Sequence, residues 1–102
     1  MNLRIKELNL LQTTFHRFPV VREVRVFGSR ATDTARRTSD LDLAVSAPDA
    51  TPGEWADICE ALENAPLIYE LDVVRPERTL NPRLKAKIES EGVVIYPEPQ
   101  VL

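Results

Sequence analysis

The sequence predicts an α/β (α+β) protein in which helices pack on a mixed β-sheet. Apolar residues switch between helical and strand periodicity along the chain, in the order α-β-(short α)-β-α-β-α-β. The 102 residues suffice for one hydrophobic core, and no linker or internal repeat divides them, so residues 1–102 are expected to form a single domain. Hydrophobic residues make up 43% and charged residues 28% of the chain, which is the balance of a folded protein.

The first predicted elements are an amphipathic helix over residues 3–15 and a strand over residues 20–27. Apolar residues recur at helical spacing in the helix, and β-branched and aromatic residues dominate the strand. The strand ends at Gly28, and residues 29–35 favour a short helical turn. The connection from Gly28 to Asp40 is short for a parallel crossover, so the first two strands are expected to be antiparallel.

The next element is a strand with two different faces. Leu41, Leu43 and Val45 alternate with polar or small residues, so the aliphatic side chains share one face. Asp40 and Asp42 then lie together on the other face. The sequence therefore predicts a carboxylate-bearing face on this strand.

A second long helix is predicted between the loop at residues 48–53 and Pro66. Trp55, Ile58, Cys59 and Leu62 stand at i, i+3, i+4 and i+7, which indicates a buried stripe, although an exposed tryptophan that anchors a partner is an alternative. The chain has one cysteine, so it can form no internal disulfide and offers no thiolate cluster for zinc.

The last third of the chain predicts a strand, a helix and a short edge strand. Residues 67–74 alternate so that Asp72 points away from the Leu71 face. Residues 82–91 follow an Asn-Pro start signal and end before a glycine, which is typical of a helix. Residues 93–96 can add an edge strand.

Charge and hydropathy exclude several classes of function. The net charge is −3 and no dense basic run is present, so a long nucleic-acid partner is disfavoured. The apolar stretches are far shorter than a membrane span, and the N-terminus lacks the apolar core of a signal peptide. A cytoplasmic protein is expected.

Three aspartates in strand-like segments are the candidate metal ligands. Asp40 and Asp42 share one strand face, and Asp72 on another strand could complete a cluster whose repulsion a cation would relieve. Ligand sets made only of oxygen atoms favour magnesium or manganese. Such a site holds a triphosphate and activates an attacking hydroxyl. A pair of aspartates alone is commonly a solvated turn, and the other residues of the pattern argue against that interpretation here.

The turn at residues 28–30 is the candidate phosphate site. Gly28 allows close approach of backbone N–H groups, Ser29 offers its hydroxyl, and Arg30 adds positive charge. A Gly-Ser pair is also a common turn signal, and Ser29 could simply cap the following helix. The context of the three aspartates favours the phosphate-binding interpretation.

These motifs together resemble the minimal nucleotidyltransferases of the polymerase-β-like superfamily, which include the MntA-like antitoxins. The resemblance rests on Gly-Ser-Arg-Ala at residues 28–31, Ser-Asp-Leu-Asp-Leu at residues 39–43, and Asp72, and it extends over nearly the whole chain. It implies the polymerase-β-like fold, Gly28 and Ser29 at the nucleotide phosphates, and Asp40, Asp42 and Asp72 as magnesium-binding acids. Asp33 stands where family members often have a second glycine.

The resemblance also implies an activity and a partner. A magnesium-dependent enzyme, with one or two Mg²⁺ ions, would transfer a nucleoside monophosphate, AMP from ATP, to a hydroxyl of a partner protein. Similar small proteins are antitoxins paired with a helical HEPN ribonuclease toxin, and some of them transfer AMP to a tyrosine of that toxin. Alternatives are a non-catalytic antitoxin or binding module of the same fold, and a small-molecule nucleotidyltransferase that needs a partner subunit.

Overall fold

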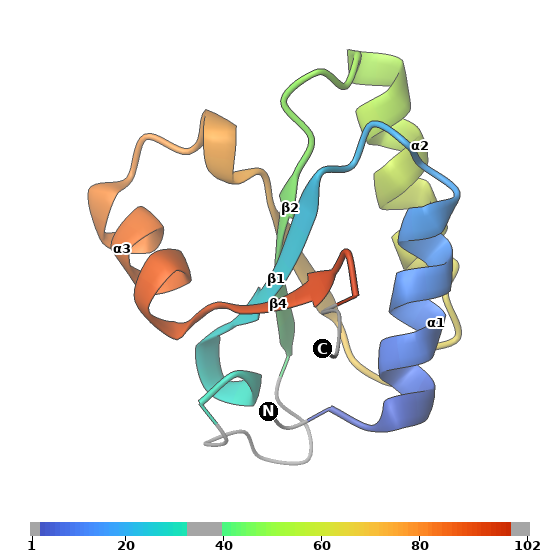
Figure 1. Cartoon of the computed structure of the whole chain (residues 1–102), viewed down its shortest axis with the longest axis horizontal. Helices are drawn as coiled ribbons and strands as arrows, with labels where there is room; N and C mark the ends of the chain where they lie inside the picture. The colour runs from blue at the N-terminus through green and yellow to red at the C-terminus, as the bar shows by residue number, and fades with distance from the viewer. Residues whose placement is uncertain (1–2, 33–39, 99–102) are drawn as a thin grey trace.

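The computed structural model of the chain describes residues 3–32 and 40–98. Within these residues the helices and strands follow the predicted order (Figure 1). The elements are α1 (Ile5–His16), β1 (Glu23–Phe27), the 3₁₀ turn η1 (Gly28–Arg30), β2 (Leu41–Ser46), α2 (Pro52–Glu63), β3 (Leu71–Val74), the 3₁₀ turn η2 (Pro76–Arg78), α3 (Pro82–Glu91) and β4 (Val93–Tyr96).

The four strands form one mixed sheet in the order β3-β2-β1-β4. β1 is antiparallel to both β2 and β4, and β2 is parallel to β3. The antiparallel pairing of the first two strands and the mixed sheet are thus confirmed. Asp42 of β2 lies opposite Phe27 of β1 on one side and Asp72 of β3 on the other.

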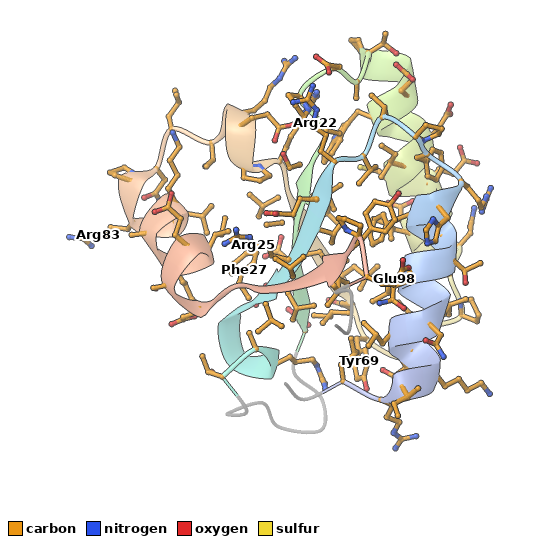
Figure 2. All side chains as sticks on the ribbon, in the orientation of Figure 1. Arg22, Arg25, Phe27, Tyr69, Arg83 and Glu98 are labelled. Atoms are coloured by element: carbon orange, nitrogen blue, oxygen red, sulfur yellow. The ribbon has the colours of Figure 1, made fainter. Side chains whose placement is uncertain are left out.

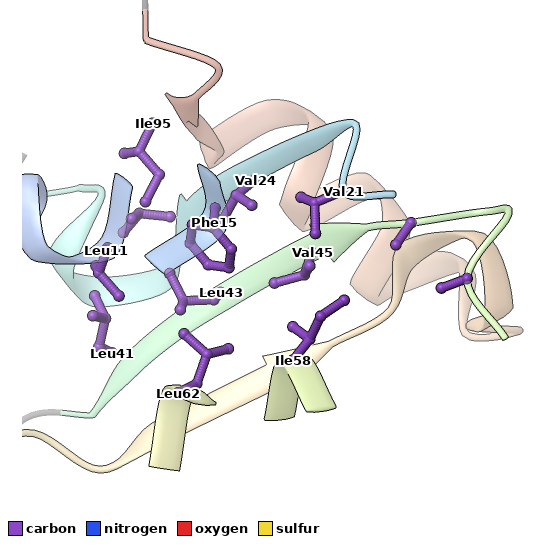
Figure 3. Packing of buried hydrophobic residues seen from close by; sticks show 13 residues of the cluster. Leu11, Phe15, Val21, Val24, Leu41, Leu43, Val45, Ile58, Leu62 and Ile95 are labelled. Atoms are coloured by element: carbon purple, nitrogen blue, oxygen red, sulfur yellow. The ribbon is translucent and has the colours of Figure 1, made fainter. Parts of the chain in front are cut away.

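Helices cover both faces of the sheet. α1 and α2 lie side by side on one face, and α3 lies on the other (Figure 1). The main core fills the space between the sheet and the first two helices (Figure 3). Its buried residues are Leu11, Phe15, Val21, Val24, Val26, Leu41, Leu43, Val45, Ala47, Ala50, Ile58, Leu62 and Ile95.

A smaller apolar cluster joins α3 to the opposite face. Phe27, Ala44 and Ile88 are buried there, with Val74 and Leu84 packed against them. The aspartates Asp42 and Asp72 belong to the same face as these residues, because strand side chains alternate. The α3 face is therefore apolar in part and acidic in part.

The caps of the later helices follow directly from the sequence. Thr51 and Glu54 form a capping box at the start of α2, in which each side chain accepts a hydrogen bond from the other residue's backbone N–H. Asn81 accepts hydrogen bonds from the backbone N–H groups of Arg83 and Leu84 at the start of α3. α3 therefore begins where its Asn-Pro signal predicts, whereas α2 begins at Pro52, within the stretch that was expected to be a loop.

The third strand is shorter than expected. The predicted strand over residues 67–74 forms only at Leu71–Val74, because β2 begins at Leu41, directly opposite Leu71. Leu67 and Tyr69 pack against the main core without joining the sheet. β1 begins at Glu23 instead of residue 20, and the 3₁₀ turn η2 was not predicted.

The far ends of β2 and β3 are joined by a hydrogen-bonded cluster that we term the Arg75 clasp. Arg75 Nη2 donates to the carbonyl oxygens of Ala47 and Ala50 at 2.8 and 3.2 Å, and its Nε donates to Glu77 at 3.0 Å. Glu77 also accepts a hydrogen bond from the backbone N–H of Ala47 at 2.9 Å. The guanidinium lies 4.9 Å from the ring centroid of Trp55. Each charge in the clasp thus has several partners.

Trp55 is half-buried against the main core, as the packing interpretation of the α2 stripe expected.

Among the described residues, no helix combines the length and the apolar character that crossing a membrane requires.

Candidate active site

Two of the predicted acids meet at the start of the parallel strand pair. Asp42 and Asp72 are direct neighbours in the β2–β3 register, so their side chains project from the same face of the sheet. Asp42 is half-buried and Asp72 is exposed. We term these two residues the acidic pair.

Gly28 lies against this pair for two separate reasons. Its φ is +73°, a left-handed conformation that side chains rarely adopt. A Cβ atom at this position would also overlap the Oδ2 atom of Asp42. The glycine therefore provides both the turn after β1 and the space for the carboxylate, and it brings the 28–30 turn beside the acidic pair.

The pKa of Asp42 reflects the acids gathered around it. Burial raises the pKa of the Asp42 carboxyl group, and the Asp72 carboxylate raises it further. Lys87 of α3 acts in the opposite direction, Asp40 adds to the increase, and a hydrogen bond between the carboxyl groups of Asp42 and Asp72 also favours the protonated form. Among the described residues, the nearby acids and burial thus outweigh the influence of Lys87 on the Asp42 carboxyl group.

The acidic pair has the chemistry of a divalent-cation site. Carboxylate oxygens are the ligands that Mg²⁺ prefers, and a cation would remove the repulsion that raises the pKa of Asp42. The residues present therefore fit a magnesium ion bound by Asp42 and Asp72.

Asp40 lies at the edge of this arrangement. It is exposed and immediately precedes β2, although the sequence analysis expected it within the strand. Over residues 3–32 and 40–98, no three acidic, histidine or cysteine side chains are grouped closely enough to hold a metal ion together. The structure therefore brings together two of the three predicted acids, and the role of Asp40 as a ligand remains a prediction.

Arg30 is placed differently from Gly28 and Ser29. It is buried, and its guanidinium lies 3.7 Å from the ring centroid of Tyr69. A hydrogen bond with Glu7 of α1, followed by burial, raises the pKa of Tyr69. Figure 2 shows Tyr69 beside the N-terminal end of α1. Arg30 thus connects the turn to the α1 side of the molecule. Ser29, which follows Gly28 directly, is half-buried. Nucleotide binding by either residue remains a prediction.

Lys87 is a cation near Asp42 that was not among the predicted site residues. It lies on α3, which packs against β1 and the 28–30 turn, and it is close enough to Asp42 to lower the pKa of that residue. Helical spacing offered no signal for it, because the spacing of Leu84 and Ile88 does not show which flank of α3 lies nearer the acids. Asp33, which stands in place of a family glycine, lies outside the described residues.

A cleft among the described residues lies elsewhere, between α1 and α2. It has a volume of about 550 Å³, and its lining includes Leu10 and Phe18 from the α1 region and Ala61 from α2. These helices cover the face of the sheet opposite α3 (Figure 1). The candidate site is identified by its chemistry and by the register of β2 and β3.

Two solved structures resemble this fold. One is described as a crystal structure of a toxin-antitoxin with AMP-PNP; it is 23% identical with a TM-score of 0.71, and the match covers 87% of this chain and 72% of that chain. The other is a mutant of the toxin-antitoxin MntA-HpeT in which two aspartates, two positions apart, are replaced by glutamate; it is 20% identical with a TM-score of 0.69, covering 87% and 71%. At these identities the likeness shows the fold alone.

The sequence comparison identifies the family. No match was found among curated proteins. The family model described as polymerase beta, nucleotidyltransferase matches residues 9–100, which is most of the chain. The expected polymerase-β-like fold is confirmed by this match and by the structural likeness. The chain belongs to the polymerase β-type nucleotidyltransferase family.

Proposed function

We propose that this protein is a magnesium-dependent nucleotidyltransferase that transfers AMP from ATP to a hydroxyl group of a partner protein. The observation that carries the proposal is the acidic pair beside the left-handed Gly28. Membership of the nucleotidyltransferase family supports the reaction type. The AMP-PNP in a structure of similar fold supports an adenine nucleotide.

In this proposal Asp42 and Asp72 hold the metal ion, and Asp40 joins them from the residue before β2. When bound, one or two Mg²⁺ ions neutralise the phosphate charge that develops during transfer. Gly28 allows the backbone N–H groups of its turn to approach the phosphates closely, and Ser29 donates its hydroxyl to them. The buried Arg30 keeps this turn in place through its contact with Tyr69 and adds positive charge to the turn that binds the phosphates.

The transfer itself is an in-line substitution at the α-phosphorus of ATP. The acceptor hydroxyl oxygen forms a bond to that phosphorus, the bond from the phosphorus to the β-phosphate oxygen breaks, and pyrophosphate leaves. The hydroxyl proton passes to the carboxylate of Asp72, which is the exposed member of the acidic pair and so can reach an incoming acceptor. The product is an AMP phosphodiester on the acceptor.

The proposed acceptor is a helical HEPN-type toxin in the cytoplasm, for which this chain would be the antitoxin. Both similar structures are described as toxin-antitoxin assemblies. The mutant structure replaces two aspartates with the spacing of Asp40 and Asp42, which supports the same pair as the reacting site here. A substrate domain is not needed when the acceptor is a folded partner.

The test uses ATP labelled on the α-phosphate, magnesium, and a lysate of the source cell. Wild-type protein should label a discrete protein band, and Asp42→Asn should reduce that labelling about a hundredfold or more, because one ligand and one charge of the metal site are lost. Asp49→Asn is the matched control, since this exposed aspartate pairs with Arg22 away from the acidic pair and should label like wild type.

Equal labelling by wild type and Asp42→Asn would contradict the catalytic mechanism. Absence of labelling by the wild type, together with suppression of the toxin by both proteins, would instead identify a non-catalytic antitoxin.

A further inference from the structure

We propose that the acceptor hydroxyl reaches the acidic pair on an extended segment of the partner protein, which pairs with the free edge of β3 as an additional, antiparallel strand. The inference rests on the proposed nucleotidyltransferase function and adds to it the conformation in which the acceptor binds. The occupant of this edge is the acceptor chain, because Asp72, the exposed member of the acidic pair, belongs to β3 itself.

The first argument is the position of β3 at the end of the sheet. Among the described residues, β2 is its only partner strand. Leu41 of β2 donates its backbone N–H to the carbonyl oxygen of Glu70 at 3.0 Å. Backbone polar groups alternate in direction along a strand, so those of Asp72 also face β2, whereas those of Leu71 and Val73 face away from it. In the described part of the chain, no turn, loop or side-chain hydrogen bond uses these outward groups.

Such an edge is suited to bind an extended peptide through main-chain hydrogen bonds. In an antiparallel arrangement, Leu71 and Val73 would each exchange hydrogen bonds with the residue opposite. The acceptor residue between these two lies opposite Asp72 in a non-hydrogen-bonded pair, in which the Cα atoms are about 4.5 Å apart. Both side chains of that pair project from the same face of the sheet. A hydroxyl-bearing residue at this position is therefore carried directly to the acidic pair.

The access to this position is open on the acidic face. α3 covers that face over β1 and the 28–30 turn, against which it packs. β3 lies two strands away from the β4 edge and one strand beyond β1, with β2 between them. The exposed side chain of Asp72 thus stands on the part of the face that adjoins the free edge.

A cleft on the α2 face lies beside the start of the same strand. It has a volume of about 320 Å³, and its lining includes Leu62 of α2, Leu67 and Leu71. Strand side chains alternate, so the acceptor residue opposite Leu71 directs its side chain to this face. The exposed carboxylates of Glu63 and Glu70 also line the cleft. Lysine or arginine suits this lining, because each has an apolar stem and a positive end.

The first test compares two substitutions at Val73. Val73→Pro removes an outward N–H group and leaves the pairing with β2 in place, since edge strands tolerate proline where the N–H faces solvent. Val73→Ala keeps this N–H but also removes most of the valine side chain, so it is the matched control. In the lysate assay with α-labelled ATP and magnesium, Val73→Pro should label the acceptor about tenfold less than wild type. Val73→Ala should stay within about threefold of wild type.

Nucleotide binding separates the acceptor edge from the rest of the site. Calorimetry with MgCl₂ and α,β-methylene ATP, which cannot release pyrophosphate, should give the wild-type affinity for both variants. Circular dichroism verifies that both variants fold. Equal labelling of the acceptor by Val73→Pro and wild type would overturn the inference.

A second experiment changes the acceptor, so it does not depend on the folding of a variant. Mass spectrometry of the labelled band identifies the modified residue, and a synthetic peptide of about nine residues centred on it is the probe. N-methylation of the residue directly before or after the modified one removes an N–H that would bond to β3, and should reduce labelling about tenfold. N-methylation two residues away, where the N–H faces solvent, is the control and should leave labelling within about threefold.

Three results would overturn the inference on the acceptor side. The first is equal labelling of all N-methylated peptides. The second is a peptide that stays unlabelled by an enzyme that labels the intact acceptor, which would indicate a folded docking surface. The third is a wild-type dimer in sedimentation that Val73→Pro dissociates, because a second copy would then occupy the edge. If wild type labels no protein at all, the proposed function fails together with the inference, so the two failures are distinguishable.

Discussion

The two ends of the parallel β2–β3 pair differ in how their charged side chains are paired. At the start of the strands, Asp42 and Asp72 face each other, and burial with mutual repulsion raises the pKa of Asp42. At the other end, the Arg75 clasp surrounds its charges with partners. Burial alone would raise the pKa of Glu77, but its backbone hydrogen bonds and Arg75 outweigh burial and lower it.

This contrast separates stability from function within a few residues. The clasp satisfies both of its charges internally and ties the loops after β2 and β3 together. The acidic pair places two carboxylates side by side, at a position where an incoming cation can balance their charge. Mutations at the clasp should therefore change stability, and mutations at the acidic pair should change ligand binding.

The largest expected effect on stability comes from Arg75→Gln. The substitution removes the donor to Ala47 and Ala50 and leaves Glu77 without its cation, so we expect a loss of about 2–4 kcal/mol in the free energy of unfolding. Urea denaturation measures the loss. The affinity of the remaining folded protein for Mg²⁺ should stay that of wild type.

Arg22→Gln is the control for Arg75→Gln. The ion pair of Arg22 with Asp49 is exposed, so its loss should cost less than about 1 kcal/mol. Similar losses for both arginine variants would mean that the clasp is no more stabilising than a surface ion pair.

Gly28→Ala should cost about 2–3 kcal/mol, from the positive φ and from overlap with the Asp42 carboxylate. In an Asp42→Ala background the overlap disappears, and the cost of the glycine substitution should fall to the backbone contribution of about 1–2 kcal/mol. A double-mutant cycle from chemical denaturation measures this coupling. Additive effects would show that Gly28 is required only for its conformation.

The pH dependence of stability tests the clasp through Glu77. The folded-state pKa of Glu77 lies below its ordinary value of 4.5, so the unfolded chain binds the proton more readily. Its stabilisation is present above pH 4.5 and is lost as the pH falls through the lower folded-state pKa. Glu77→Gln should therefore cost about 1 kcal/mol at pH 7 and progressively less in acid. A constant difference across this range would rule out a charge effect.

The smallest expected effect on the free energy of unfolding concerns Asp42, and its dependence on pH has the opposite sign to that of Glu77. Its folded-state pKa lies above the ordinary value of 3.8, so wild type loses stability as the pH rises from 3.8 through the folded-state value. Without metal, Asp42→Asn should be more stable than wild type at pH 7 by less than about 1 kcal/mol, since solvent screens the site. Thermal unfolding in EDTA and in MgCl₂ measures this difference, and added magnesium should stabilise wild type only.

The sequence predicted most of the fold because its local signals agree with the packing. The alternation of residues 41–46 predicted both faces of β2, and the Asn-Pro signal at Asn81 predicted the start of α3. The shorter extent of β3 could not be predicted in this way. Residues 67–70 have strand-like composition, but their place in the sheet depends on where β2 begins.

The site was predictable in its residue types and less so in its geometry. Spacing alone placed Asp42 and Asp72 on compatible faces, and the register confirms that they are neighbours. The contact of Arg30 with Tyr69 joins residues far apart in sequence, so no local pattern could reveal it. Lys87 escaped notice because a helical repeat does not indicate which flank of α3 faces the acids.

The close fit between Gly28 and Asp42 links the evolution of the two positions. While the aspartate is present, a larger residue at position 28 meets its carboxylate, so selection that retains the proposed metal ligand Asp42 also retains the glycine. In a descendant that no longer needs the proposed transfer and has a shorter side chain at position 42, a side chain at position 28 would no longer overlap a carboxylate. Asparagine, which tolerates the left-handed conformation, then becomes an acceptable replacement at position 28. Paired changes at these two positions would therefore distinguish lineages that have lost the reaction from those that retain it.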